Sequence, residues 1–309
     1  MILCCGEALI DMLPAETAAG AAAFVPYVGG AVFNTAIALG RLGEPVGLLT
    51  GLSTDDFGGL LRAALEDSGV DTRLAVTTER VTALAFVALS DGQARYSFHD
   101  EGSAGRMLQS ADIPPLPAEV GALFFGGISL IAEPSATTLE ALQAAEGEGR
   151  LTMLDPNVRP AFVSDPASYR ARIGRMMARA DIFKVSDEDL AWLLPDDRGP
   201  MEKLRAIAAE GPALALMTRG AEGAVGVTRS GLEVARPARP VDVVDTVGAG
   251  DTFNAGFLAG LAARGLLDPA GIAGIGAADL ASALDHGMAA AAVVVARAGA
   301  QPPWRHELT

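Results

Sequence analysis

The sequence predicts an α/β fold: one large domain with a mostly parallel central sheet and a small appended sheet. Short apolar runs alternate with helical patterns along the chain, and half of the 309 residues are hydrophobic, enough for a sizeable core. In addition, an Asp91-Gly92 pair between two strand-like runs predicts a hairpin outside this alternation. We therefore expect a single domain over residues 1–309.

The expected core strands are short apolar runs that end in polar residues or glycine. They cover residues 2–5, 46–50, 122–126, 151–154, 181–185 and 213–218. Amphipathic spacing predicts helices over residues 34–43, 57–70 and 251–265. The first begins near Asn34 and ends at Gly43. The second ends at Gly69 and is expected to present one apolar face, made of Leu60, Leu61, Ala64 and Leu65.

Two stretches, residues 12–28 and 81–99, interrupt the alternation and are predicted to be short strands. We expect them to form one small sheet, inserted from about 12–28 and 81–103. Both stretches leave the main domain where the strands of an α/β sheet end, which is where such sheets bind ligands. A lid over a site is the role we expect, and an ordinary solvated hairpin is the alternative.

Charge limits the classes of partner. The net charge is −15 and the calculated pI is about 4.6, which argues against nucleic-acid binding and against anchoring to anionic membranes. The two cysteines, Cys4 and Cys5, are neighbours and form neither a disulfide framework nor a spaced metal site. We expect buried thiols in a reduced, cytoplasmic protein.

Targeting segments are not expected. The first 13 residues lack a basic region and contain two acids, so they do not resemble a signal peptide. Residues 286–300 come nearest to a membrane span, but their small side chains suit a tightly packed internal helix.

The stretch DTVGAGDTFNAG, residues 245–256, places a Gly248-Ala249-Gly250 turn at the start of the third predicted helix. Free backbone N–H groups at such a start can bind a phosphate or a developing oxyanion. Asp251 lies at that point and could accept a proton from a substrate hydroxyl. The alternative is that Asp251 or Asp245 only caps the helix.

Two further motifs follow predicted strands or precede a helix. In GGAVFN, Gly29 and Gly30 permit close approach of a ligand to the main chain, and Asn34 can both donate and accept hydrogen bonds. Asp11, after the first strand, adds an acceptor at the same sheet edge. The alternatives are a tight turn for the glycines and an N-cap for Asn34.

DPNVR follows the strand at 151–154 and offers Asp155, Asn157 and Arg159 at the same edge. A loop salt bridge is the alternative. KVSDED, residues 184–189, resembles a capping box begun by Ser186, and its carboxylates near Lys184 could hold Mg²⁺ through water beside nucleotide phosphates. The two interpretations are compatible with each other.

TRGAEG, residues 218–223, could follow the phosphates or ribose of a nucleotide, or could be a simple connection between strands. Other nucleotide and catalytic motifs are absent from the sequence. It has no Gly-Lys-Ser/Thr P-loop, no Gly-x-Gly-x-x-Gly after the first strand and no Gly-x-Ser-x-Gly, and its three scattered histidines do not support zinc chemistry.

Together these motifs resemble the ribokinase-like sugar kinases, the PfkB carbohydrate kinase family. The resemblance covers essentially the whole chain, from CCGEALIDML through GGAVFNTAIALGRLG and DPNVRP to DTVGAGDTFNAGFLAGL and ARAGAQPPW. It implies a three-layer α/β/α sandwich with a Rossmann-like sheet and a discontinuous β-sheet lid. It also implies ATP-dependent phosphorylation of a sugar hydroxyl, with Mg²⁺ and a monovalent cation such as K⁺.

The resemblance also implies roles for individual residues. Asp251 resembles the catalytic base. The backbone of Gly248, Ala249, Gly250 and Asp251 resembles the anion hole of the family. The implied sugar contacts are Asp11, Gly29, Gly30, Asn34, Phe98, Asn157, Arg159 and Asp251. The implied nucleotide contacts are Lys184, Ser186, Thr218, Gly220, Gly223, Gly248, Gly250 and His286.

Two cation sites are implied. Asp245 and Val247 resemble the loop for the monovalent cation, and either Glu188 or Asp189 resembles the acid that places Mg²⁺ through water. The family's Asn-x-x-Glu motif is here Ser186-Asp187-Glu188-Asp189, so the sequence leaves the choice between the two acids open.

Among members of the family, DPNVRP and KVSDED look most like fructokinases and 2-keto-3-deoxygluconate kinases. D-Fructose is the expected sugar, with 2-keto-3-deoxygluconate, another sugar or a nucleoside as alternatives. A sugar-binding regulator without catalysis is a further alternative. The lid also implies a homodimer joined through it.

Overall fold

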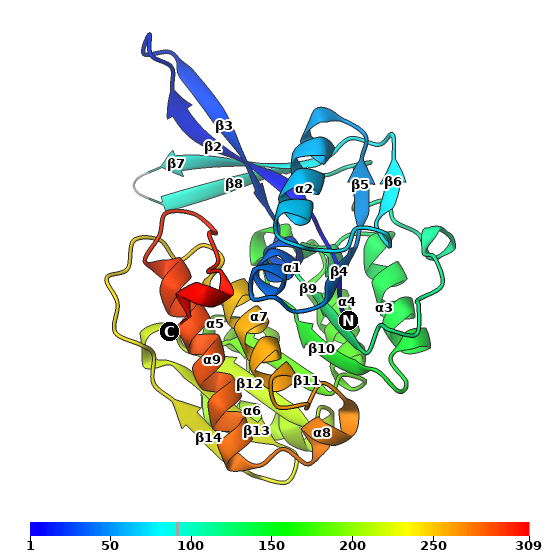
Figure 1. Cartoon of the computed structure of the whole chain (residues 1–309), viewed down its shortest axis with the longest axis vertical. Coiled ribbons are helices and arrows are strands. Elements are labelled where there is room, and N and C mark those ends of the chain that lie inside the picture. The colour runs from blue at the N-terminus through cyan, green and yellow to red at the C-terminus, as the bar shows by residue number, and fades with distance from the viewer. Residues whose placement is uncertain (91–92, 309) are drawn as a thin grey trace.

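The computed structural model describes residues 1–90 and 93–308 and has an eight-stranded central sheet (Figure 1). Six parallel strands are β1 (Ile2–Cys5), β4 (Val46–Leu49), β9 (Ala122–Gly126), β10 (Leu151–Asp155), β11 (Ile182–Ser186) and β12 (Leu214–Thr218). Two antiparallel strands, β13 (Ala224–Thr228) and β14 (Glu233–Arg236), extend one edge. The order is β14-β13-β12-β11-β10-β9-β1-β4. The six predicted core strands are confirmed within one or two residues.

Helices cover both faces of this sheet, because its parallel strands are buried on both sides. Alternate residues belong to two different core clusters: Ile2 and Cys4 to one, Leu3 and Cys5 to the other. The first cluster packs under α1 (Ala31–Arg41), α2 (Asp56–Asp67), α7 (Ala249–Ala262), α8 (Pro269–Ala273) and α9 (Ala277–Val295). The second packs under α3 (Ser135–Glu146), α4 (Pro166–Met177), α5 (Asp187–Leu193) and α6 (Pro200–Glu210). The predicted three-layer sandwich is confirmed, and both thiols are buried and free.

Short elements complete the described chain. A two-stranded sheet pairs β5 (Gly51–Ser53) with β6 (Val76–Thr78). Single 3₁₀ turns are η1 (Ser110–Asp112), η2 (Ile128–Leu130), η3 (Pro160–Phe162), η4 (Gly220–Glu222) and η5 (Arg305–Glu307).

The predicted helices are present, with two corrections. α1 begins at Ala31 after Gly30, whose φ of 110° is a conformation that favours glycine, so Asn34 lies inside the first turn and does not cap the helix. On α2, Leu61 and Leu65 are buried, but Leu60 is 47% exposed. Leu60 is one position before Leu61, about 100° around the helix, and so turns away from the core.

The small sheet forms from two separate stretches, as expected. Its order is β3 (Ala22–Gly29), β2 (Leu9–Glu16), β7 (Ala83–Ser90) and β8 (Gln93–His99). The β2–β3 hairpin projects well beyond the main domain (Figure 1). The Asp91-Gly92 turn predicted between β7 and β8 lies outside the described residues.

Helix α9 is the one helix in the described ranges that is long and apolar enough to cross a membrane, with a mean hydropathy of 1.3. It packs along α7 through small residues. A Cβ built on Gly256 of α7 would lie 2.8 Å from Ala290 Cβ, and one on Gly287 of α9 would lie 2.9 Å from the Phe253 ring. Residues 277–295 therefore form a tightly packed internal helix of this domain, as the sequence analysis predicted for this region.

Candidate active site

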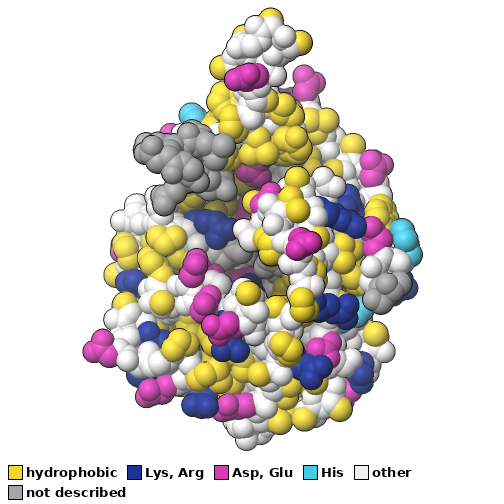
Figure 2. Space-filling model, turned by 90° about the vertical axis from the view of Figure 1, so that its left-hand side faces the viewer, with side chains coloured by type: hydrophobic (Ala, Val, Ile, Leu, Met, Phe, Trp, Pro, Cys, Tyr) yellow, Lys and Arg dark blue, Asp and Glu magenta, His cyan; other side chains and the backbone are white. Residues whose placement is uncertain are grey.

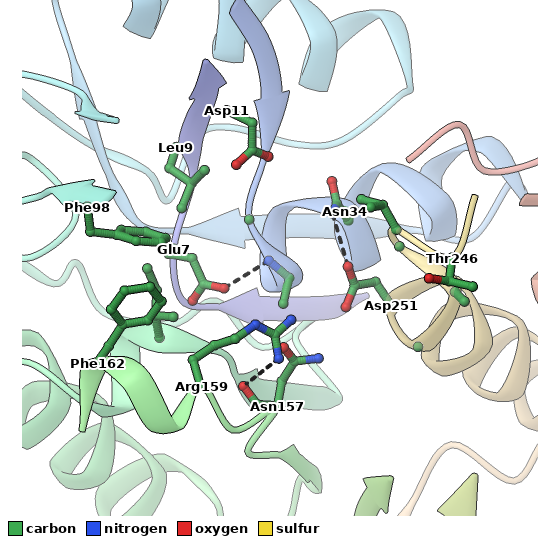
Figure 3. Close-up of a pocket in the computed structure, with 17 residues that line it drawn as sticks. Glu7, Leu9, Asp11, Asn34, Phe98, Asn157, Arg159, Phe162, Thr246 and Asp251 are labelled. Atoms are coloured by element: carbon green, nitrogen blue, oxygen red, sulfur yellow. Dashed lines mark hydrogen bonds between the residues drawn. The ribbon is translucent and has the colours of Figure 1, made fainter. Parts of the chain in front are cut away.

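A cavity of about 320 Å³ lies at the carboxyl ends of β1 and β10, between the main domain and the small sheet (Figure 3). This is the edge at which open α/β sheets bind ligands. It brings together eleven predicted site residues: Asp11, Gly30, Asn34, Phe98, Asn157, Arg159, Val247, Gly248, Ala249, Gly250 and Asp251. Five separate stretches of the sequence thus meet at one place.

The N-terminus of α7 forms one wall of this cavity. Gly248 adopts a left-handed conformation with φ of 77°, and no side chain caps the helix. The backbone N–H groups of Gly250 and Asp251 have no partner within the described part of the chain, whereas Ala249 N–H donates to the Thr246 carbonyl at 3.2 Å. The predicted anion hole therefore has two free donors, and Ala249 contributes the turn rather than a free N–H.

Asp251 is buried in this wall and does not cap the helix. Its side chain turns toward α1, where Oδ2 accepts a hydrogen bond from Asn34 Nδ2 at 3.0 Å (Figure 3). Burial raises the pKa of the Asp251 carboxyl to about 7, and the Asn34 amide acts in the opposite direction. A carboxyl group with that pKa is suited to exchange a proton near neutral pH.

Asp11 reaches the cavity from β2 of the small sheet. Burial raises the pKa of its carboxyl to about 6. Gly29 lies beside it on β3, and a Cβ there would come within 2.3 Å of Asp11 Oδ2. The predicted contact at Gly29 is thus indirect: Gly29 does not line the cavity but makes room for the Asp11 side chain.

The loop after β10 supplies Asn157 and Arg159. Asn157 has φ of 43°, and asparagine tolerates this left-handed conformation better than most residues. Its N–H donates to Asp155 Oδ1 at 3.2 Å, which fixes the turn. The Arg159 guanidinium is exposed, donates to the Val158 carbonyl at 3.1 Å and leaves most of its donors toward the cavity.

The sequence analysis did not propose six of the residues that line this cavity: Glu7, Leu9, Ala31, Ile128, Phe162 and Thr246. Two of them have polar or aromatic contacts that shape the site. Glu7 is buried, and its carboxylate accepts the N–H groups of Ala31 at 2.9 Å and Ser129 at 3.2 Å. Phe162 of η3 packs edge-on against Phe98 of β8, with ring centroids 4.4 Å apart. Glu7 could have been found because it follows β1 at the sheet edge, whereas Phe162 carries no signal in the sequence.

A second cavity, of about 510 Å³, lies on the other side of the α7 N-terminus. The predicted Thr218, Gly220 and Gly223 line it. Glycine is required at position 223, because φ is 96° and a Cβ there would lie 2.1 Å from the Arg236 carbonyl oxygen. The two cavities share Thr246, Ala249 and Gly250, but Asp251 lines only the first.

Two large cavities that meet at a helix N-terminus, with a buried carboxylate on one side, match what transfer of an anionic group between two substrates needs. The model of the family described as pfkB family carbohydrate kinase matches residues 1–307. The chain belongs to this family. It is a sugar kinase, a phosphotransferase that uses ATP and a divalent metal ion.

Known proteins similar to this kinase include a fructokinase from Rhizobium leguminosarum bv. trifolii, 51% identical over 271 residues that cover 86% of this chain and 81% of the relative. The structure of a Xylella fastidiosa fructokinase with bound ATP has a TM-score of 0.88 and 30% identity, and covers 99% of this chain and 96% of its own. A Vibrio cholerae O395 fructokinase, in fructose, ADP and calcium ion bound form, has a TM-score of 0.81 and 27% identity, with 97% and 94% covered.

Three residues expected at the kinase's nucleotide site line neither cavity. Lys184 is buried beneath α7 and pairs with Asp155, with Nζ 2.9 Å from Oδ2. Ser186 caps α5 by accepting Asp189 N–H at 3.0 Å, as the capping alternative predicted. His286 lies on α9 about 200° around the helix from Met288, and its Cβ faces Gly260 of α7.

The second cavity is instead completed by apolar residues that the sequence analysis did not propose. They come from the loop after β14 and from α9, and include Ala238, Pro240, Val241, Val243, Met288, Ala291, Ala292 and Val295. The prediction for His286 is corrected accordingly, because the face of α9 that lines the cavity is the one that carries Met288 and Ala292.

The acids proposed for cations lie in different surroundings. Glu188 is exposed, whereas Asp189 is turned inward, and burial raises the pKa of its carboxyl to about 6 with a further contribution from Asp155. Within residues 1–90 and 93–308, no group of three acidic, histidine or cysteine side chains could hold a metal ion on its own.

Asp245 accepts the N–H groups of Val247 at 3.0 Å and Gly299 at 2.9 Å, and so joins the loop before α7 to the C-terminal segment.

Proposed function

We propose that this kinase transfers the γ-phosphoryl group of ATP to a hydroxyl of D-fructose. One observation carries the proposal: the two cavities share the start of α7, and Asp251 faces only the first of them. The first cavity has polar walls suited to a sugar, and the second has apolar walls suited to a nucleobase. The fructose assignment is supported by the similar fructokinases and by the DPNVRP and KVSDED motifs.

Asp251 is the base in the proposed reaction. Its ionised carboxylate accepts the proton of the acceptor hydroxyl while that oxygen forms a bond to the γ-phosphorus. The bond between the γ-phosphorus and the bridging oxygen breaks, and ADP leaves with that oxygen. The N–H groups of Gly250 and Asp251 stabilise negative charge on the transferred group, and they do so most strongly in the transition state.

We propose Mg²⁺ as the divalent ion, held through water by Asp189 beside the nucleotide phosphates. The residues fit this arrangement, because a single inward-turned carboxylate without further protein ligands suits an ion that keeps waters and binds phosphates. When bound, such an ion would neutralise negative charge on the phosphates. Glu188 is the less suitable acid because it points into solvent.

A monovalent cation, commonly K⁺ in this family, is proposed at the loop of Asp245 and Val247. Asp245 fixes this loop next to the turn that begins α7, since it bonds both Val247 and Gly299. A Cβ on Gly248 would lie 2.9 Å from Ala300 Cβ, so the loop and the C-terminal segment are in close contact. A cation bound there would act on the geometry of the anion hole rather than on the sugar.

The small sheet is proposed to act as a lid over the sugar cavity. Asp11 and Phe98 come from this sheet, and the Phe98–Phe162 contact joins it to the main domain at the cavity wall. Closure would exclude water and so suppress ATP hydrolysis.

Hydrophobic side chains are exposed on the projecting hairpin (Figure 2), with Phe24 48% and Tyr27 52% exposed, which supports the proposed homodimer through the lid. A cytoplasmic location also stays a prediction.

An assay of ADP release over a panel of acceptors tests the proposal. The panel contains D-fructose, 2-keto-3-deoxygluconate, D-ribose and a nucleoside, each with ATP, Mg²⁺ and K⁺. We expect the highest kcat/KM with D-fructose. A higher kcat/KM with 2-keto-3-deoxygluconate would replace D-fructose as the assigned acceptor. Stabilisation by a sugar without any ADP release would contradict catalysis.

A further inference from the structure

Beneath the anion hole lies a buried polar network that the proposed mechanism does not use. Asp155, Lys184 and Asn254 are each no more than 2% exposed. Asp155 Oδ2 accepts from Lys184 Nζ at 2.9 Å and from Asn254 Nδ2 at 2.7 Å. Because Asp155 ends β10, Lys184 lies on the neighbouring β11 and Asn254 lies on α7, these bonds tie one helix to two strands of the sheet.

The network lies directly below the glycine turn. A Cβ built on Gly250 would be 3.3 Å from Lys184 Nζ, so the absence of a side chain at position 250 leaves room for the ammonium group. Asn254 follows Gly250 by four residues, about one turn of α7, and therefore lies on the same face of that helix. The position of Lys184 relative to the free N–H groups thus depends on Asp155, which Asn254 in turn holds.

The composition of this network is not the one that stability alone would favour. Asn254 Oδ1 is buried and has no hydrogen-bond partner within the described residues. A buried amide with one unsatisfied end costs stability, and a buried ion pair is often no better for folding than well-packed apolar residues. Such groups in a native structure call for a functional explanation.

We propose that Asn254 and Asp155 are positioning residues for phosphoryl transfer, which hold the Lys184 ammonium against Gly250 beneath the α7 N-terminus. A cation held there strengthens the positive field of the N–H groups that face the transferred phosphoryl group. The inference rests on the proposed function, because it takes the start of α7 as the place of transfer. Lys184 thereby acts from beneath the site, not as a contact on the wall of the nucleotide cavity.

An exchange of the two side chains tests the proposal. Asn254→Asp and Asp155→Asn each replace the amide–carboxylate pair by two like groups, whereas the double variant Asp155→Asn/Asn254→Asp restores one amide and one carboxylate of the same size. We expect each single variant to lose about 100-fold in kcat, with little change in the KM of the sugar, because the effect falls on the transition state. The double variant should recover most of that loss, as coupled residues do.

Leu258→Val is the matched control for general loosening of α7, because Leu258 is buried on the same helix outside the network. All variants are assayed well below their melting temperatures, with ATP and with the panel sugar that the wild type phosphorylates fastest. Wild-type activity on fructose decides the proposed substrate separately from the network. Single variants with wild-type kcat, a double variant as slow as the single ones, or an equal loss in Leu258→Val would overturn the proposal. If one single variant does not fold, kcat of the double variant still decides, since only a restored pair gives near wild-type turnover.

Discussion

Asn34 and Asp251 form a side-chain hydrogen bond of 3.0 Å that joins α1 to α7 on the wall of the first cavity. Both helices present their N-termini to that cavity, so the bond connects the two glycine-containing segments GGAVFN and GAGDTF. Because Asn34 donates, it favours the ionised form of Asp251, against the larger and opposite effect of burial. Burial raises the pKa of the proposed base and the Asn34 hydrogen bond lowers it, so its protonation is the first property to test.

Replacement of the base is expected to separate catalysis from folding. Asp251→Asn should keep the fold and sugar binding but lose turnover by about 1,000-fold or more, on the pattern of removing a general base. The folded pKa of about 7 exceeds the ordinary value of 3.8, so ionisation of Asp251 destabilises the folded protein increasingly as pH rises from about 4 to 7.

The amide has no such cost, and Asp251→Asn should therefore melt about 5 °C higher than the wild type at pH 8, with a smaller difference at pH 5. ADP release and thermal melting at the two pH values measure these effects. Turnover near that of the wild type would remove Asp251 from the role of base.

The pH dependence of the reaction should follow the same carboxyl group. We expect kcat/KM to rise with pH through about 7, because only the ionised Asp251 can accept a proton. Asn34→Ala removes the donor that favours ionisation, so its midpoint should lie at higher pH. Asn34 also lines the sugar cavity, and a higher KM alone would not test the pairing. An unchanged midpoint in Asn34→Ala would show that this hydrogen bond does not control the base.

Much of this site could be predicted because its polar residues lie at the ends of predicted strands or at the start of a predicted helix. Asp155 follows a buried strand and Asp251 follows a glycine turn before a helix, so their place at one edge of the sheet follows from the α/β pattern. The same reasoning extends to Glu7, which the sequence analysis did not propose as a site residue although it lies two residues after the end of β1.

The rest of the site depends on facts that a pattern does not contain. Lys184 alternates with its strand neighbours in an apolar run, and only the packing of α7 over β11 reveals that its ammonium faces Gly250. On α9, apolar and small residues occur on every face. The sequence pattern therefore does not show which face of the helix lines the second cavity, and so does not distinguish Met288 from His286.

Arg159 is expected to act on the sugar and not on the nucleotide. Arg159→Ala should raise the KM of the sugar by about tenfold, as loss of a charge-assisted hydrogen bond would, and leave the KM of ATP unchanged. Arg198→Ala is the matched control, because its guanidinium pairs with Asp196 at 2.8 Å in an exposed loop that lines neither cavity. Steady-state kinetics with each substrate varied in turn measure both values. An unchanged KM of the sugar would exclude Arg159 from the site.

The assignment of the second cavity to the nucleotide can be tested by filling it. Ala292 of α9 lines that cavity, and Ala292→Phe should raise the KM of ATP by about tenfold or more, since it occupies space that the ligand needs. The KM of fructose should not change. Ala278→Phe, at an exposed position of the same helix, controls for the added aromatic ring. A higher KM of the sugar with an unchanged KM of ATP would reverse the assignment of the two cavities.

Gly29 and Gly59 provide a matched pair of glycine-to-alanine substitutions. At Gly29 the new Cβ would lie 2.3 Å from Asp11 Oδ2, so the carboxylate must move away from its place in the sugar cavity. We expect Gly29→Ala to raise the KM of fructose by about tenfold, because a displaced acceptor no longer meets the sugar hydroxyl, while the KM of ATP is unchanged. At Gly59, inside α2, a Cβ meets nothing within 4 Å, and Gly59→Ala should stabilise the protein by about 1 kcal/mol without a kinetic effect. Thermal melting and steady-state kinetics of the two variants measure both outcomes. If Gly29→Ala bound fructose as the wild type does, Asp11 would not be the sugar contact that its position at the cavity indicates.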